Sequence, residues 1–306
     1  MKKKVLAMTL TAMMGVSLLA GCGSASSSAA ASGSASAAEE TSAASTAAST
    51  TSEAGSSATD EASATSTASA DSDLAYVQGQ GKLVVGITDF EPMDYKDESG
   101  NWIGFDADLA KAFAESIGVE AEFVEIDWDN KILELDGKTI DCVWNGMTLT
   151  DEVKSSMSCT NAYLNNAQIV VVPADKADQY QTEDSLKDLN FAVEAGSAGE
   201  AVATEKGFNA TPVKAQSDAL MEVAAGTSDA AIIDSLMAAA MVGEGTGYEN
   251  LTYTIGLSTE EYGVGFRQGS DLADALNDFL KTSSADGTLK KIAETYGVQA
   301  ALVDQQ

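Results

Sequence analysis

A tract of 50 residues, from Gly23 to Ser72, most strongly limits what this chain can fold into. Ser, Ala and Thr make up 41 of these residues, and the tract has no aromatic or branched aliphatic side chain. Because it has so little apolar surface to bury, it cannot offset the entropy lost on ordering and is predicted to be a disordered tether. A folded core can therefore form only within residues 73–306.

Residues 1–22, which precede this tract, have the layout of an export signal. Lys2, Lys3 and Lys4 lead into a mostly apolar stretch that is too short for an ordinary membrane span. The segment ends in Leu-Ala-Gly-Cys, which resembles the lipobox of bacterial lipoproteins. The resemblance implies that Cys22 becomes a diacylglyceryl-modified N-terminus carrying palmitate-type chains. An ordinary signal peptide with an incidental cysteine is the alternative.

Composition excludes several classes of function. Acidic residues outnumber basic ones by 47 to 17, so the chain should be repelled by nucleic acids and by anionic lipid surfaces. It has no histidine, no P-loop and no dinucleotide fingerprint. Cys142 and Cys159 are too few for a disulfide scaffold or a zinc site; they could pair, but we favour free buried thiols. We expect no metal, no cofactor and no catalytic residue.

Residues 73–306 alternate between strand-like and helix-like segments. Short apolar, β-branched runs predict strands, and apolar residues at helical spacing predict helices. The expected strands cover residues 82–88, 120–126, 139–144, 167–172, 190–193, 230–234 and 262–267. The expected helices cover residues 106–117, 131–135, 200–205, 217–225, 235–241, 270–283 and 289–296. This order predicts an α/β protein with mostly parallel sheets.

Five stretches together resemble the family-3 solute-binding proteins of bacterial ABC importers. They are residues 104–110 (GFDADLA), 141–150 (DCVWNGMTLT), 195–197 (AGS), 229–234 and 263–291. The resemblance implies a two-lobed, periplasmic-binding-protein-like fold, with two parallel-sheet lobes joined by two hinge strands. Lobe 1 would comprise residues 73–171 plus 262–306, and lobe 2 residues 172–261. The hinges would lie near residues 170–174 and 256–263.

The resemblance also implies a ligand site in the cleft between the lobes. Asp234 would bind an ammonium group, although a helix N-cap is the alternative for this residue. Phe90 and Trp128 would hold the ligand's side chain between aromatic faces, with core packing as the alternative. Trp144, in a predicted turn at residues 144–146, is ambiguous between these two roles. Asn145 and Thr148 match positions where the family uses small polar residues and backbone N–H groups, and Ser197 would donate to a carboxylate at a helix N-terminus. For Thr148 and Ser197 the alternative is an ordinary turn residue.

The chain departs from the family at the residue expected to grip a carboxylate. The resemblance places an arginine at position 153, but this chain has Val153, and Arg267, its one arginine, matches no ligand position. Lys154 or backbone N–H groups are the candidate replacements, and recognition of a carboxylate is expected to be weak. Asp89, Glu91 and Asp94 at the cleft mouth would favour a cationic ligand, although a solvated acidic loop is the reading we favour.

These observations predict a lipid-anchored extracellular solute-binding protein and not an enzyme. It would capture an amino acid or a related small amine and deliver it to an ABC permease, as a monomer on the outer face of a cell membrane. The long tether favours a Gram-positive surface. One alternative is a dehydratase-type enzyme on the same fold, with Glu91 or Glu194 as proton donor. The other is a ligand-sensing surface receptor.

Replacing the lipobox cysteine tests the predicted anchor. Cys22→Ser is expected to stop lipid attachment, and the protein should then move from the membrane fraction to the soluble fraction. Quantitative blotting of the fractions measures this. Undiminished membrane retention of the variant would contradict the anchor.

Overall fold

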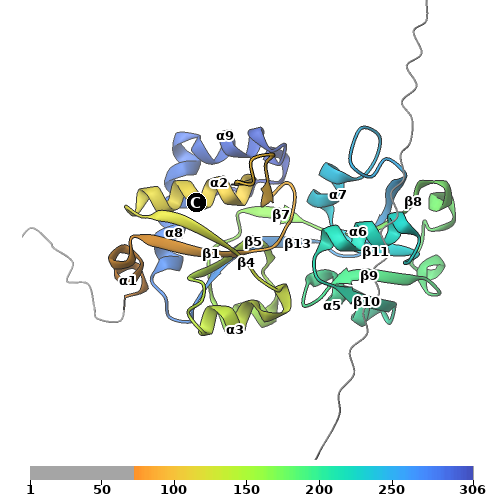
Figure 1. Ribbon diagram of the computed structural model, residues 1–306, viewed down its shortest axis with the longest axis horizontal. Helices are drawn as coiled ribbons and strands as arrows, with labels where there is room; N and C mark the ends of the chain where they lie inside the picture. Colours follow the sequence, from red (N-terminus) through yellow and green to blue (C-terminus); the bar gives the residue numbers. More distant parts are fainter. Residues whose placement is uncertain (1–71, 306) are drawn as a thin grey trace, which may run out of the picture. The chain divides into compact units, whose positions relative to one another are not determined.

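The computed structural model describes residues 72–305, so the predicted export segment, Cys22 and all but the last residue of the predicted tether lie outside the described part. The described chain forms two α/β lobes, each built on one sheet, and this confirms the predicted fold class (Figure 1). No helix among residues 72–305 is long and apolar enough to cross a membrane.

The sheet of the first lobe has the strand order β4-β1-β5-β13-β6, with β7 paired to β13. Its strands are β1 (Lys82–Ile87), β4 (Glu120–Glu125), β5 (Cys142–Thr148), β6 (Ser158–Cys159), β7 (Leu164–Asn166) and β13 (Glu260–Phe266). Its helices are α1 (Asp73–Gln80), α2 (Phe105–Ser116), α3 (Lys131–Asp136), α4 (Asp151–Ser156), α8 (Leu272–Asp286) and α9 (Thr288–Thr295), and β2 (Tyr95–Lys96) and β3 (Trp102–Ile103) form a separate hairpin. Short 3-10 helices cover Trp128–Asn130 and Gln299–Ala301. Figure 1 shows α2 and α9 on one side of this sheet and α3 on the other.

The sheet of the second lobe has the order β10-β9-β11-β8-β12. Its strands are β8 (Gln168–Pro173), β9 (Asn190–Glu194), β10 (Asn209–Val213), β11 (Ala230–Asp234) and β12 (Leu251–Gly256). Its helices are α5 (Ala198–Lys206), α6 (Gln216–Ala225) and α7 (Ser235–Met241), with 3-10 helices at Ala174–Gln179 and Glu183–Leu186. The bounds of β11 and α7 are those predicted from the sequence.

Both sheets are mixed, which corrects the prediction of two parallel-sheet lobes. In each sheet three strands run parallel, β4-β1-β5 in the first and β10-β9-β11 in the second. The strands that arrive from the other lobe run the opposite way: β13 is antiparallel to β5, and β8 is antiparallel to β11. A strand that enters a sheet from a crossing connection does not follow a helix of that sheet, so it is free of the parallel βαβ pattern.

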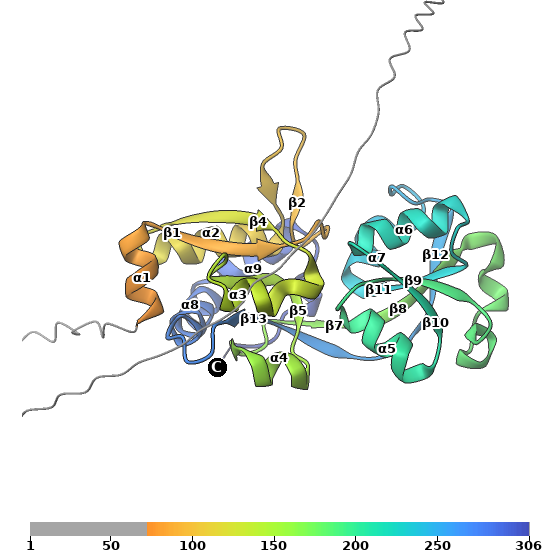
Figure 2. The same ribbon diagram turned by 60° about the horizontal axis from the view of Figure 1, so that its bottom comes forward.

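Two connections cross between the lobes (Figure 2). The first crossing lies at Ala167, because β7 ends in the first sheet at Asn166 and β8 begins in the second at Gln168. The predicted hinge at residues 170–174 and the predicted lobe boundary after residue 171 are therefore placed too late. Residues 170–172 are fully buried in the second lobe. The second crossing, between β12 and β13, lies within the predicted range 256–263.

Strand β5 also corrects a local prediction. Residues 144–146 were expected to form a turn after a strand ending at 144, but β5 continues through them to Thr148. The polar residue that suggested a turn, Asn145, is buried and fully hydrogen-bonded inside the lobe. Burial with every hydrogen bond satisfied allows a polar residue to occupy a central strand.

The two cysteines of the described chain are free thiols, as favoured from the sequence. Cys142 lies on β5 and Cys159 on β6, and both strands pair with β13, which runs between them. Two strand spacings separate such residues by about 10 Å, which exceeds the reach of a disulfide.

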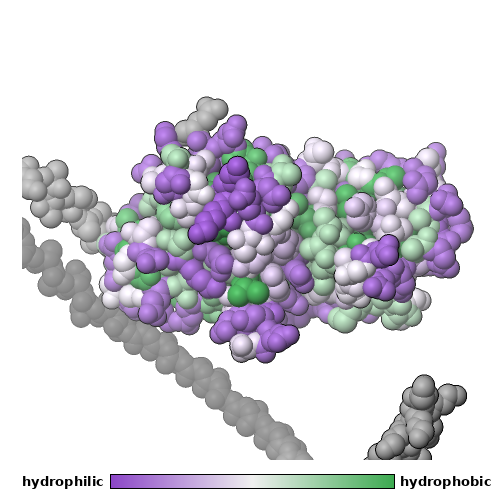
Figure 3. Space-filling view, turned by 90° about the horizontal axis from the view of Figure 1, so that it is seen from above, coloured by the Kyte–Doolittle hydropathy of each residue, from purple (hydrophilic) through white to green (hydrophobic). Residues whose placement is uncertain are grey.

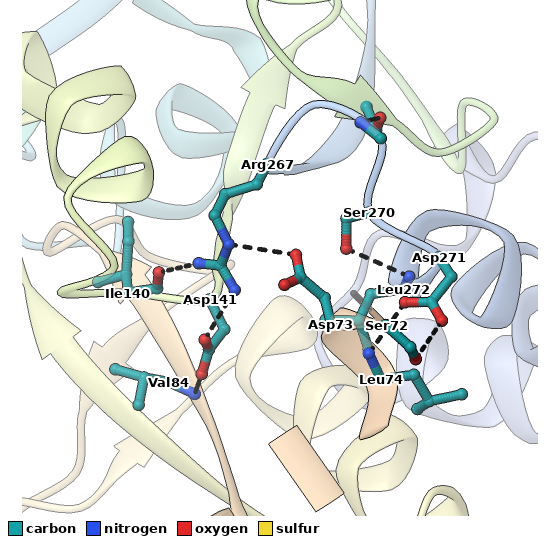
Figure 4. A network of polar contacts seen from close by, with 12 residues as sticks. Ser72, Asp73, Leu74, Val84, Ile140, Asp141, Arg267, Ser270, Asp271 and Leu272 are labelled. Atoms are coloured by element: carbon teal, nitrogen blue, oxygen red, sulfur yellow. Dashed lines mark hydrogen bonds and ion pairs between the residues drawn. The ribbon is translucent and has the colours of Figure 1, made fainter. Parts of the chain in front are cut away.

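Arg267, at the end of β13, ties together three parts of the first lobe (Figure 4). Its guanidinium donates to Asp73 Oδ2 of α1 at 3.1 Å, to Asp141 Oδ1 at 3.2 Å and to the carbonyl oxygen of Ile140 at 2.8 Å. Asp141 in turn accepts from the backbone N–H of Val84 at 2.9 Å. The arginine is 8% exposed, so the ion pairs lie largely out of water. Arg267 therefore has a structural role in the first lobe and is not among the residues that line the cavity described below.

Removing this arginine is expected to destabilise the fold. Arg267→Ala leaves the carboxylate of Asp141 buried without its counter-charge, which should lower the free energy of unfolding by about 3 kcal/mol. Urea denaturation of both proteins measures the difference. Lys82→Ala, which removes an exposed ion pair with Glu122, is the matched control and should shift the midpoint far less. Equal midpoints for Arg267→Ala and the unmodified protein would contradict the assigned role.

Candidate functional site

A cavity of about 290 Å³ is lined by residues of both lobes, close to the lower end of the ~300–1,000 Å³ range of ligand pockets. The lining from the first lobe comes from the short helix after β4, from the end of β5 and from the start of α4: Trp128, Lys131, Ile132, Asn145, Gly146, Met147, Thr148, Thr150, Asp151, Glu152 and Val153. The lining from the second lobe is Glu194, Gly196, Ser197, Ala198, Ala201, Gln216 and Asp234. The carboxyl ends of β5, β9 and β11 thus converge on it, where α/β sheets place their ligands.

Asp234 ends β11 and is 4% exposed at the wall of this cavity. Its carboxylate accepts hydrogen bonds from the side-chain amides of Asn166, Gln168 and Gln216, the Gln168 Nε2 contact being 2.7 Å. Its backbone N–H donates to Gln216 Oε1 at 2.8 Å. The residue stands at the N-cap position of α7, but its side chain makes no capping hydrogen bond. The carboxylate is therefore held by neutral donors, without a cationic partner among residues 72–305.

A second carboxylate, Glu260, lies beside Asp234. The amide nitrogens of Asn166 and Gln168 each donate to both acids, to Asp234 Oδ1 and to Glu260 Oε1. Burial, together with the charge of Glu260, raises the pKa of Asp234 well above its usual range. Asn166 and Gln168 lie on either side of the first crossing between the lobes. Glu260 is the first residue of β13, directly after the second crossing. The paired carboxylates thus lie where the two lobes join.

Glu194 ends β9 and is 3% exposed in the same cavity. Its Oε1 atom has no hydrogen-bond partner among the described residues. Burial raises the pKa of this carboxyl to about 8, against the opposing effects of the Lys131 charge and of the Thr88 and Gln216 side chains. The sequence interpretation considered Glu194 only as a proton donor for an enzyme. The sequence does contain a signal for a role in the site, because Glu194 is a charged residue at the end of an otherwise apolar strand.

Lys131 is a cavity residue that sequence interpretation missed. It is 8% exposed, and its ammonium donates to the carbonyl oxygen of Gly196 in the second lobe at 2.8 Å and to that of Trp128 at 3.2 Å. The ammonium also lies 5.0 Å from the centre of the Trp128 ring. Burial lowers its pKa. The signal was available: Lys131 lies one helical turn before Leu135 on the face that Leu135 buries.

The structure brings Trp128, Thr148, Ser197 and Asp234 of the predicted site together in the cavity lining. Trp128 is 7% exposed and offers its ring to the cavity beside Lys131. Ser197 is the N-cap of α5, and its hydroxyl accepts from the backbone N–H of Glu200 at 3.2 Å. Its hydroxyl is therefore engaged in capping, while its residue still borders the cavity.

Asn145 also borders the cavity, but its side chain serves the fold. Its Oδ1 accepts from the backbone N–H and the hydroxyl of Thr88 at 2.8 and 2.7 Å, and its Nδ2 donates to Thr88 O and to Asp94 Oδ2. The neighbouring Gly146 N–H donates to Asp106 Oδ2 at 2.7 Å. Burial raises the pKa of Asp106 to about 6. These contacts leave the Asn145 side chain no free hydrogen-bonding atom for a ligand.

Phe90 and Trp144, which are predicted from the sequence to contact a ligand, lie outside the lining of this cavity. The Phe90 ring packs edge-on against Tyr262, with centroids 6.4 Å apart. It also fills the space beside Gly146, where a Cβ atom would approach the ring to 2.5 Å. Trp144 is fully buried, with its ring 6.3 Å from that of Phe113 of α2. Alternate residues of a strand face opposite sides, so Trp144 points to the helix-covered core.

The residues discussed for carboxylate recognition are also separated. Val153 is 5% exposed and borders the cavity, but Lys154 is exposed and does not. Lys154 therefore does not stand where the family's arginine is expected, and Lys131 is the one basic residue in this lining.

The predicted acidic loop is not uniformly solvated. Asp94 is fully buried and bonded to Asn145, whereas Asp89 is exposed. Asp89 and Glu91 border a separate, open depression beside the β2–β3 hairpin. No group of three or more Cys, Asp or Glu side chains within residues 72–305 could hold a metal ion.

The raised pKa of the buried Glu194 carboxyl predicts how the stability of the protein depends on pH. Its pKa is about 8 in the folded state against a reference value of 4.5. Between these pH values the unfolded chain loses a proton that the folded chain keeps, so this group's contribution to stability falls as pH rises from about 4.5 to about 8. Glu194→Gln should therefore raise the Tm of the ligand-free protein little at pH 5 and progressively more up to pH 8. Scanning fluorimetry of both proteins across that range measures the difference, and a pH-independent difference would contradict it.

Comparison with known proteins agrees with this architecture. The family model for bacterial extracellular solute-binding proteins, family 3, matches residues 83–299. The arginine-binding extracellular protein ArtP of Bacillus subtilis is 32% identical over 228 residues, 71% of this chain and 87% of that protein. The L-cystine-binding protein TcyJ of Escherichia coli is 28% identical over 232 residues, 72% of this chain and 84% of that protein.

A solved structure gives the same result. An ancestral amino-acid-binding protein, described as a precursor of cyclohexadienyl dehydratase, shares 32% sequence identity with a TM-score of 0.68, covering 74% of this chain and 99% of its own. These three proteins are named as binding proteins, and the chain is likewise a binding protein and not an enzyme. It belongs to the bacterial extracellular solute-binding proteins of family 3.

Proposed function

We propose that this protein captures a free amino acid outside the cell and delivers it to an ABC permease. The carrying observation is the carboxylate of Asp234, which is buried in a cavity lined by both lobes and held by amide groups alone. A buried carboxylate without a counter-charge is costly, and an ammonium group would supply that counter-charge. The names of the relatives, arginine-binding and cystine-binding, support an amino acid as the ligand.

The lobes offer the means to enclose such a ligand. Lys131 of the first lobe donates to Gly196 of the second, and a Cβ atom at Gly196 would come within 2.7 Å of Asp129 Cα. Lys214, between β10 and α6, also forms ion pairs across the cleft with Glu125 and Asp127, each at 3.7 Å. Rotation about the two crossings would separate these contacts and open the cavity.

We also propose that the protein is anchored by a lipid on Cys22 and works as a monomer on the outer face of the membrane. The sequence supports the anchor through the lipobox and the Ser/Ala/Thr-rich tract that follows it. On the face seen in Figure 3, hydrophobic residues form small separate patches among hydrophilic ones, which suits a monomer.

A ligand screen tests the function. Thermal shift of the protein should be measured with arginine, cystine, neutral and acidic amino acids and polyamines. A cognate ligand at 100 times its Kd should stabilise the protein by about 2.7 kcal/mol. Uptake of that ligand should then fall in cells lacking the gene; unchanged uptake would indicate a sensing role. Absence of any shift with every amino acid would contradict the proposal.

Asp234→Ala tests the ammonium site. Loss of a charge-assisted contact to a buried partner should cost about 2–5 kcal/mol, or roughly 30-fold or more in affinity for the amino acid found in the screen. Isothermal titration measures this, with circular dichroism to verify the fold. Asp175→Ala, at an exposed acid of the second lobe, is the control and should bind normally. Unchanged affinity in Asp234→Ala would show that Asp234 is not the ammonium site.

A further inference from the structure

Three ionisable side chains are buried in the wall of the cavity without forming an ion pair. Lys131, Glu194 and Asp234 are 8%, 3% and 4% exposed. Within residues 72–305, none of them has an oppositely charged group within 4.0 Å. The other charged residues of the lining, Asp151 and Glu152, are exposed to water at the start of α4. Buried ionisable groups that the protein leaves without an ion-pair partner can pair with the charges of a bound molecule.

Lys131 provides the positive charge. An ammonium group has three N–H donors, and the two contacts of Lys131 are to neutral carbonyl oxygens, those of Gly196 and Trp128. One donor therefore remains for a ligand, and the ammonium has no ion-pair partner within 4.0 Å among residues 72–305. A carboxylate satisfies both, since it accepts a charge-assisted hydrogen bond and neutralises the ammonium.

The two carboxyl groups, those of Glu194 and Asp234, lie side by side on the second lobe. Strands β9 and β11 run parallel, with Ala230 opposite Phe191 and Ala231 opposite Ala192. Their carboxyl ends, Glu194 and Asp234, consequently emerge next to each other. Asp234 is held by three amides, whereas Glu194 Oε1 has no donor among residues 72–305. An ammonium can pair with the first carboxyl group, and a second cationic group can pair with the other.

We propose that the cavity selects a basic amino acid, whose carboxylate binds Lys131, whose α-ammonium binds Asp234 and whose cationic side chain binds Glu194. The proposal rests on the amino-acid-binding function proposed above and adds the ligand class and two binding residues to it. A basic amino acid carries one negative and two positive charges, which complement the ionised forms of Lys131, Asp234 and Glu194. A neutral amino acid would leave Glu194 buried without a partner.

Three probes that differ by one charged group test this assignment. L-arginine carries all three charges, agmatine lacks the carboxylate, and L-citrulline replaces the guanidinium with a neutral group of similar shape. In calorimetric titrations of the full chain, L-arginine should bind about 30-fold or more tightly than either of the other two. L-lysine should bind better than its neutral analogue L-norleucine for the same reason.

Two variants assign the charges to residues. Lys131→Met should weaken the binding of L-arginine by about 30-fold and leave the binding of agmatine nearly unchanged. Lys131→Arg should restore most of the lost affinity. Glu194→Gln should weaken the binding of L-arginine by a similar factor and leave the binding of L-citrulline nearly unchanged. Lys187→Met removes an exposed contact with Asp184 within the second lobe, outside this lining, and should change the binding of all three probes little and equally. The melting temperature of each variant verifies that it is folded.

Each contrary result has its own meaning. Equal losses of L-arginine and agmatine in Lys131→Met would show that Lys131 only holds the lobes together, through Gly196. L-citrulline binding as tightly as L-arginine would overturn the role of Glu194. Binding of cystine or a neutral amino acid, with none of arginine or lysine, would overturn the selection of a basic ligand and leave the amino-acid-binding function intact. No binding of any amino acid would remove both.

Discussion

The amide cluster around Asp234 is the interaction on which the binding site depends. Asn166 and Gln168 stand on the two sides of the first crossing, and Gln216 begins α6. Together they keep this carboxyl group buried without an ion-pair partner among residues 72–305. Because the donors come from separate elements, the site exists only when the crossing strands and the second sheet are in place. The site therefore depends on the fold as a whole, since no single motif contains all of its residues.

The sequence predicted those parts of the molecule that local pattern controls. Ala230–Asp234 is an apolar run that ends at a polar residue and is followed by a helix, so strand, helix and the position of Asp234 could all be read directly. The edge strand Asn209–Val213 was missed because its residues are polar or half-exposed and carry no alternation. The strand through Asn145 was misjudged as a turn, because a polar residue followed by glycine looks like a turn until its buried partners are known.

Long-range contacts set the remaining limit on what could be predicted. Lys131 is a cavity residue only because the second lobe brings Gly196 to it, 65 positions along the chain. Phe90 and Trp144 were plausible aromatic contacts, but the packing of Tyr262 and Phe113 places both in the core. A resemblance to a family predicts which positions of this chain correspond to the family's site. It does not predict what surrounds those positions when a nearby residue, such as Val153, differs from the family.

The neighbouring carboxyls of Asp234 and Glu260 have a thermodynamic consequence. Burial and the neighbouring charge of Glu260 raise the pKa of Asp234, so this carboxyl holds its proton to a higher pH than an exposed aspartate does. A cation that binds beside Asp234 lowers this pKa again and favours release of the proton to the solvent. Capture is then an exchange of one positive charge for another, and the heat of binding includes the ionisation heat of whichever buffer accepts the proton.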